Sequence, residues 1–441
     1  MRGAYSHYLA QRETQGRPIR LGLAGVGQMG TGIVAQSRHI PGLSVLAVAE
    51  LDVERAQQVL QLAGHAEPVI SEDADRATRE LLDGRVVVCR DAELLAQLPL
   101  DVVIEATGVP EVGARMGIAC ALHGRHLVSM NVEADATIGR FLRHMFDLSG
   151  AVYTLAAGDE PSAIFDLVDF ARTVGLDVVA AGKGKNNPLR PRATAAEIKV
   201  EAARKHMNPK MLAAFVDGTK TMCEMTVLSN ATGYPPDVPG MHGPRADARE
   251  LATVFRPISE GGVLKGLGVV DYVTGDVAPG VFVIVRTEDR TVSEDLRYLK
   301  VGAGPYWALI RPYHLANLEV PISIVRVMRD GYPTLVSSFH AADVVAVAKR
   351  RLQVGDLIRG IGGDEVYGQI WPADEAEAHG FVPIGLTEGA LVRAPVEADT
   401  PLSFDDLELQ EGSVLLRAWR LQQHMDELKG DAVQRWPQRA T

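Results

Sequence analysis

Two lysines and two asparagines are grouped in a loop near the middle of the chain. The run GKGKNNP, residues 182–188, follows a strand-like apolar segment, so its side chains would lie at the carboxyl edge of a sheet. A lysine there can protonate a substrate oxygen or stabilise an alkoxide, and an asparagine can hold a hydroxyl. Lys183, Lys185 and Asn187 are therefore candidate catalytic residues, with a solvated basic turn as the alternative.

A second group of charged residues lies in the run AAFVDGTKTMCEMTVLSN. Asp217, Lys220 and Glu224 are spaced by three and four residues, which places them on one face of a predicted helix. There a carboxylate can orient a lysine and tune its pKa. A solvated ion-pair stripe is the alternative, but the apolar surroundings favour a charged face that lines a cleft.

Two further groups are candidates for binding an anionic substrate or a metal. Asp159 and Glu160 lie between a strand and a helix, where they either satisfy the helix N-terminus or hold a substrate or divalent metal. Guanidinium and imidazole groups suit a phosphate or carboxylate, although a lone histidine is more often structural. The cationic candidates are Arg190, Arg192, Arg311 and His314.

The clearest motif is a G-x-G-x-x-G run that follows an apolar strand and opens an amphipathic helix. This context predicts a dinucleotide site, with the pyrophosphate on the helix N-terminus. Glu50, about twenty residues further on, is placed to accept hydrogen bonds from a ribose, which favours NAD over NADP; capping of the next helix is its alternative role. The motif residues are Gly25, Val26, Gly27, Gln28, Met29 and Gly30.

Small residues end another predicted strand of the same region. The run DVVIEATG closes on Ala106, Thr107 and Gly108, where a nicotinamide ribose could pass, or where the strand merely turns before Pro110 opens a helix. We assign these three residues to the cofactor site, together with Asn131, which follows the strand-like run RHLVSM.

Short apolar runs alternate with longer amphipathic ones from residue 18 onward, which predicts βαβ units and an α/β fold with a doubly wound parallel sheet. Further on, residues 194–230 are predicted to be helical, and the two apolar runs within 261–285 to form a hairpin. The tail is rich in short strands until a helix in its last ~25 residues. We therefore expect a Rossmann domain at 1–150, an α+β catalytic domain at 151–335 and a β-rich domain at 336–441.

Composition restricts the class of partner. The 441 residues carry a formal net charge of -11, which disfavours nucleic acid and anionic membranes and favours small molecules. Three distant cysteines give neither a disulfide framework nor a zinc site, and we expect a cytoplasmic protein because no signal-like or membrane-spanning run is found.

These motifs together resemble a known family. GVGQMG, GDEPS, GKGKNNP, FVDGTKTMCEM, GPYWALIRPYHLANLE and AKRRLQVGDLIRGIGG are similar to segments of SAF-domain-containing oxidoreductases with a homoserine dehydrogenase-like N-terminal domain, a group that includes the 1-deoxy-D-xylulose 5-phosphate reductoisomerase-like (DRL) enzymes. The resemblance implies a Rossmann domain, a catalytic domain that dimerises and a C-terminal SAF domain. It also implies an NADPH-dependent rearrangement and reduction of a deoxyketose phosphate to 2-C-methyl-D-erythritol 4-phosphate.

The chain departs from that pattern at two places. Homoserine dehydrogenases carry an Asn-Lys pair where this chain has Asn131, Val132 and Glu133, and Glu50 does not suit an NADPH-using enzyme. The expected function is thus an NAD(P)-dependent oxidoreductase of a small polyhydroxylated anion, a sugar phosphate or sugar acid, acting as a homodimer or higher homo-oligomer. A divalent metal at Asp159 and Glu160 would serve an isomerisation. The alternatives are a simple dehydrogenase and a non-catalytic cofactor sensor.

Overall fold

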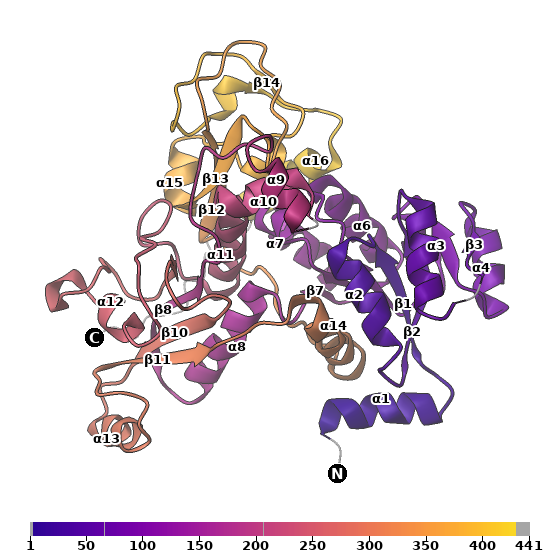
Figure 1. Cartoon of the computed structure of the whole chain (residues 1–441), viewed down its shortest axis with the longest axis horizontal. Helices are drawn as coiled ribbons and strands as arrows, with labels where there is room; N and C mark the ends of the chain where they lie inside the picture. Colours follow the sequence, from indigo (N-terminus) through magenta and orange to yellow (C-terminus); the bar gives the residue numbers. More distant parts are fainter. Residues whose placement is uncertain (1–2, 66, 206, 429–441) are drawn as a thin grey trace. The chain divides into compact units, whose positions relative to one another are not determined.

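The computed structural model describes residues 3–65, 67–205 and 207–428 (Figure 1). The chain divides into two compact units. The first comprises residues 1–162 and 315–336, and the second comprises residues 163–314 and 337–441. Within the described residues, no helix is long and apolar enough to cross a membrane.

The first unit is built on a seven-stranded parallel sheet with strand order β3-β4-β2-β1-β5-β6-β7. The order reverses beside β1, which is the topological switch point of a Rossmann fold. The predicted α/β class with a doubly wound sheet is therefore confirmed. The elements are α1 (Ala4–Thr14), β1 (Ile19–Ala24), α2 (Gln28–Ser37), β2 (Leu43–Ala49), α3 (Val53–Leu62), β3 (Val69–Ile70), α4 (Ala74–Leu82), β4 (Val87–Cys89), α5 (Leu94–Gln97), β5 (Val102–Glu105), α6 (Pro110–Leu122), β6 (His126–Ser129), α7 (Val132–Ser149) and β7 (Tyr153–Leu155).

A late segment of the chain completes this unit. Helix α14 (Ala316–Val325) and the short π-helix η2 (Arg326–Asp330) belong to it, and in Figure 1 α14 is labelled among the purple elements of the first half of the chain. The side chain of Gln36 donates a hydrogen bond of 2.9 Å to the carbonyl of Leu318, and the hydroxyl of Tyr8 donates one to the carbonyl of Met328. Since Val320 and Ile324 are also buried in the same apolar core, this segment helps to cover the sheet.

A four-stranded mixed sheet forms the centre of the second unit, in the order β11-β10-β8-β9. Strand β8 pairs with β9 in parallel and with β10 in antiparallel orientation. The predicted hairpin at 261–285 is wrong, because β8 lies between its two strands. The elements are α8 (Glu160–Thr173), β8 (Asp177–Gly184), α9 (Lys199–Arg204), α10 (Pro209–Val216), α11 (Thr219–Thr232), α12 (Leu251–Val254), η1 (Ile258–Glu260), β9 (Val269–Val273), β10 (Val281–Arg286), α13 (Arg290–Tyr298) and β11 (Tyr306–Arg311).

The predicted helical region 194–230 is divided into three helices, and this changes one candidate group. Asp217 caps the C-terminus of α10, and Gly218 has a left-handed φ of 95° before α11 begins. Asp217 therefore does not lie on the helix that carries Lys220 and Glu224. Spacing alone missed the break because a left-handed glycine ends one helix where the hydrophobic pattern continues.

The C-terminal part of the second unit consists of short strands, turns and a final helix. Strands β12 and β13 pair in antiparallel orientation, and β14 pairs with β15. Assignment of this part as an SAF domain stays a prediction. The elements are β12 (Ala342–Ala348), β13 (Val366–Pro372), α15 (Ala373–Ala378), η3 (Ile384–Leu386), β14 (Leu391–Val392), η4 (Phe404–Asp406), β15 (Leu407–Glu408) and α16 (Val414–Leu428).

One acidic side chain is enclosed at the end of β5. Glu105 is fully buried; its Oε1 accepts hydrogen bonds from the backbone N–H and the hydroxyl of Thr107, while Oε2 has no hydrogen-bond partner. Burial raises the pKa of Glu105, and the nearby Glu133 adds to that rise. The carboxyl therefore favours its neutral form more in the folded protein than in the unfolded chain.

The pKa of Glu105 predicts a pH-dependent stability. Its contribution is fully present below the unfolded pKa of about 4.3 and is lost as pH rises through the higher folded pKa. Glu105→Gln removes the titrating group, so we expect the stability of the variant relative to wild type to be greater at pH 8 than at pH 4.5. Urea unfolding at both pH values measures this, with the exposed Glu54→Gln as control. An equal effect at both pH values would contradict the prediction.

Candidate functional site

The glycine motif forms the turn between β1 and α2 at the switch point of the sheet. Gly25 has φ 86°, and a Cβ at Gly30 would lie 1.9 Å from the carbonyl oxygen of Gly25. A Cβ at Gly27, by contrast, would meet nothing within 4 Å. The first glycine thus makes the turn, the third allows close packing, and the second leaves open space at the N-terminus of α2. This is the geometry with which such a motif admits a pyrophosphate.

Glu50 follows β2 and reaches back to the glycine turn. Its Oε2 accepts a hydrogen bond of 2.9 Å from the backbone N–H of Val26. Its Oε1 also accepts a longer bond from the N–H of Asp52, whose own side chain caps α3. Asp52 therefore takes the capping role that was the alternative for Glu50. Of the remaining motif residues, Gln28 and Met29 are exposed on the first turn of α2.

The other predicted cofactor residues lie at the ends of β5 and β6. Ala106, Thr107 and Gly108 follow β5 directly, and a Cβ on Gly25 would lie 2.9 Å from the carbonyl oxygen of Ala106, so the two loops are in contact. Asn131 is fully buried and caps α7 by accepting a hydrogen bond from the N–H of Ala134. Its amide also donates to the carbonyl of Val109. The loops that bound the switch point are thus joined by close packing and hydrogen bonds.

The lysine loop has two chemically different faces. A Cβ at Gly182 would lie 2.1 Å from the carbonyl oxygen of Asp271, and one at Gly184 would lie 2.3 Å from the backbone nitrogen of Ala278. Alternate residues of an extended chain point to opposite sides, so Lys183 and Lys185 share the other face. The alternation of glycine and lysine therefore packs one side of the chain end and presents two amines on the opposite side.

Both lysines are buried and held in place. The ammonium of Lys183 donates a short hydrogen bond to Glu224 on α11, and that of Lys185 donates one of 2.8 Å to the carbonyl of Phe215 on α10. Burial, together with the positive charge of Lys183, lowers the pKa of Lys185 to about 8, against the opposing effects of Glu224 and Asp217. Lys185 is therefore suited to give up or take a proton near neutral pH.

Asp217 pairs with a lysine that the sequence did not single out. Its Oδ2 lies 2.8 Å from the Nζ of Lys349, which follows β12, and both side chains are almost fully buried. Burial raises the pKa of Asp217, while Lys349 opposes that rise. No sequence signal pointed to Lys349, because the run AKRRL resembles any basic turn after a strand.

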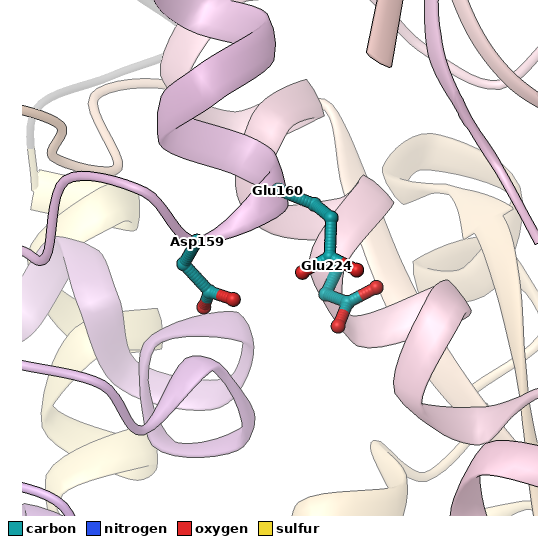
Figure 2. Close-up of side chains that lie close together, drawn as sticks. All are labelled: Asp159, Glu160 and Glu224. Carbon is teal, nitrogen blue, oxygen red and sulfur yellow. The ribbon is translucent and has the colours of Figure 1, made fainter. Parts of the chain in front are cut away.

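Three carboxylates form an acidic group at the start of α8 and on α11. Figure 2 shows Asp159 in the loop before α8, Glu160 in its first turn and Glu224 on α11. Each offers an oxygen, and these oxygens lie within 4.8 Å of one another. Carboxylate oxygens at such spacing match the ligand preference of Mg²⁺ or Mn²⁺.

The remaining candidates are distributed over the surface of the second unit. Every residue of α11 except Lys220 is buried, so this helix turns a single side chain toward accessible space. Asn187 accepts a hydrogen bond from Lys205 over 3.4 Å. Arg190 forms an ion pair with Glu201, and Arg192 forms one with Asp399. The guanidinium of Arg311 lies over the ring of Tyr313, and His314 is the next residue in the chain.

Comparison with known proteins finds a family model that matches the middle of the chain. Residues 158–320 match the family described as "Oxidoreductase DRL, catalytic domain". The region is an oxidoreductase catalytic domain. It contains the lysine loop, all three carboxylates and α11, so the resemblance is confirmed at this level.

Other comparisons involve more distant proteins. A stretch of 123 residues is 32% identical to glycosyl hydrolase family 109 protein 1 of Bacteroides thetaiotaomicron; it covers 27% of this chain and 23% of that relative's length. The 1-deoxy-D-xylulose 5-phosphate reductoisomerase of Zymomonas mobilis, solved with NADPH, is 13% identical, with a TM-score of 0.37 over 71% of this chain and 82% of that one. A Thermotoga maritima protein described as a dehydrogenase is 14% identical, with a TM-score of 0.39 over 71% and 90%.

Glycine substitutions separate packing from ligand access in the motif. Gly30→Ala places a methyl group against the backbone of Gly25, so we expect a stability loss of about 2 kcal/mol or more. Gly27 has φ -61° and open space, so Gly27→Ala should keep wild-type stability and weaken binding of a nicotinamide dinucleotide by roughly tenfold. Thermal unfolding and fluorescence titration with NADH and NADPH measure the two effects. Unchanged dinucleotide binding in Gly27→Ala would contradict the assignment of the site.

Proposed function

We propose that this chain is an NAD(P)-dependent oxidoreductase that acts on a small polyhydroxylated anion, a sugar phosphate or sugar acid. The observation that carries the proposal is the buried pair Lys183 and Lys185, of which Lys185 has its pKa lowered to about 8. The glycine turn at the switch point and the oxidoreductase family of residues 158–320 support it. A sensor that binds cofactor without chemistry needs no buried proton donor of this kind.

The charges of the side chains determine the role that we propose for each. A bound nicotinamide supplies or accepts a hydride at a substrate carbon. When the hydride goes to a carbonyl carbon, the electron pair of the C=O bond moves to oxygen, and Lys185 in its ammonium form donates the proton that yields the alcohol. Lys183, held by Glu224, stabilises the negative charge on that oxygen. Lys220 and the arginines near the lysine loop would bind the anionic group of the substrate.

The titration of Lys185 sets the expected pH profile. The proton is present below its pKa and absent above it, so kcat/KM for carbonyl reduction should fall above about pH 8. Lys185→Met should lose at least about 100-fold in kcat. Lys185→Arg should remove the alkaline limb from whatever activity remains, since an arginine does not titrate in this range. Assays of reduced-nicotinamide absorbance with pentose phosphates and aldonic acids measure both. A limb that persists in Lys185→Arg would assign the titration to another group.

Glu50 supports NAD as the cofactor. Its carboxylate, fixed beside the glycine turn, would repel the 2′-phosphate of NADP and accept hydrogen bonds from the ribose of NAD. We expect NADH to bind more tightly than NADPH, and Glu50→Gln to narrow the difference. Titration of wild type and variant with both cofactors measures this, with Asp52→Asn as the neighbouring control. Tighter binding of NADPH by the wild type would overturn the preference.

The acidic group supports an isomerisation before reduction, as in the reductoisomerase-like enzymes that the chain resembles. Asp159, Glu160 and Glu224 would hold a divalent cation, which would polarise adjacent oxygens of the substrate. Lys183 is bonded to Glu224, so the cation would share this carboxylate with the ammonium. A simple dehydrogenase would turn over fully in EDTA, whereas we expect the isomerising enzyme to require Mg²⁺ or Mn²⁺. We expect calorimetry to detect binding of the metal alone, and Glu160→Gln to weaken it.

A further inference from the structure

Lys349 lies outside the region that matches the oxidoreductase family, and its ammonium is held by buried partners. Its Nζ donates hydrogen bonds to the carbonyls of Ala193, at 2.8 Å, and Gly363, at 2.7 Å, and forms an ion pair with Asp217 Oδ2 at 2.8 Å. Two of its three donors are thus hydrogen-bonded, and the carboxylate balances its charge. A buried ammonium so fully enclosed is fixed in position, so its contacts fix the segments that supply them.

Asp217 connects Lys349 to the lysine loop. It caps α10 two residues after Phe215, whose carbonyl holds the Nζ of Lys185 at 2.8 Å. Its Oδ1 accepts from the N–H of Thr219, the first residue of α11, at 2.8 Å. The ion pair with Lys349 therefore fixes the α10–α11 junction, and this junction holds the anchor of Lys185.

Additional contacts join α11 to the C-terminal part of the second unit. The hydroxyl of Thr219 accepts a hydrogen bond from the N–H of Gly368 on β13, at 2.8 Å. Near the other end of the helix, the side chain of Asn230 accepts from the N–H groups of Ala341 and Ala342 and donates to the carbonyl of Ala342. Strands β12 and β13 thus hold α11 near both ends, and α11 carries Glu224, the partner of Lys183.

We propose that Lys349 is a positioning residue for Lys185, acting through Asp217 and the end of α10. The proposal rests on the proposed function, and it makes the C-terminal part of the chain a component of the catalytic site. Lys349 neutralises the carboxylate nearest the anchor of Lys185. The charged groups that act on Lys185 are Lys183 on β8, Glu224 on α11 and Asp217 at the end of α10. Of these, Asp217 is the group whose effect Lys349 controls.

Charge substitutions at the pair test this. Asp217→Asn leaves the ammonium of Lys349 buried without its carboxylate, and we expect the titration midpoint of Lys185 to fall by roughly 1 pH unit. Lys349→Met in the Asp217→Asn background removes that positive charge and should return the midpoint close to the wild-type value. Because the double variant has lost both side chains and still regains the midpoint, loss of structure alone cannot produce the pattern.

The readout does not depend on turnover. The rate at which dinitrofluorobenzene labels Lys185, followed by peptide mass spectrometry between pH 6 and 11, gives its midpoint in each full-length variant. The pH profile of kcat/KM should shift in parallel. If labelling shifts as described but no substrate is turned over, the proposed function fails and the positioning role stands.

A matched control comes from the same part of the chain. Arg359 is paired with the buried Glu365. Arg359→Met breaks an ion pair of similar kind, and we expect it to leave the midpoint of Lys185 unchanged. A double-variant midpoint equal to that of Asp217→Asn alone, or a shift in Arg359→Met equal to that of Asp217→Asn, would overturn the proposal.

Discussion

The second unit depends on one constraint, which is that three lysine side chains are buried. A buried charge is costly unless it is paired or hydrogen-bonded. Lys183 meets this requirement with Glu224, Lys185 with a helix carbonyl, and Lys349 with Asp217 and two further carbonyls. The partners of the three ammonium groups differ, and this difference affects their charge balance. The two lysines paired with carboxylates have their charge balanced directly, whereas Lys185 faces a neutral carbonyl and a neighbouring positive charge.

This constraint explains the unusual character of α11. The helix is buried on nearly all sides, yet it contains Thr219, Glu224, Thr226, Ser229 and Asn230. A helix packed on several faces is normally apolar throughout. Here Glu224 accepts a hydrogen bond from Lys183, and Thr219 and Asn230 form hydrogen bonds with the strands of the C-terminal part. The polar residues are therefore the means by which α11 connects β8 on one side with β12 and β13 on the other.

Much of the first unit could be predicted from local pattern, and much of the lysine site could not. The glycine motif and Glu50 are neighbours across a single βαβ unit, so spacing brings them together. The lysines were identified by the loop in which they lie, but the partner of each was not. Glu224 was expected to orient a lysine, and the structure identifies that lysine as Lys183. The helix break at Gly218 and the insertion of β8 between β9 and β10 are determined by tertiary packing, which periodicity does not encode.

The alternation of glycine and lysine in GKGK connects the local sequence pattern with the tertiary packing. Each glycine is required because a side chain would strike the backbone of a neighbouring segment, and this packing directs both lysines to the same face. Two amines on one face repel, so the charge of one disfavours protonation of the other. The glycines thus contribute to the low pKa of Lys185 although neither touches its amine. Replacing the pattern by one with larger residues would not merely loosen the strand, because it would alter the distance between the two charges on which the proton-transfer role of Lys185 depends.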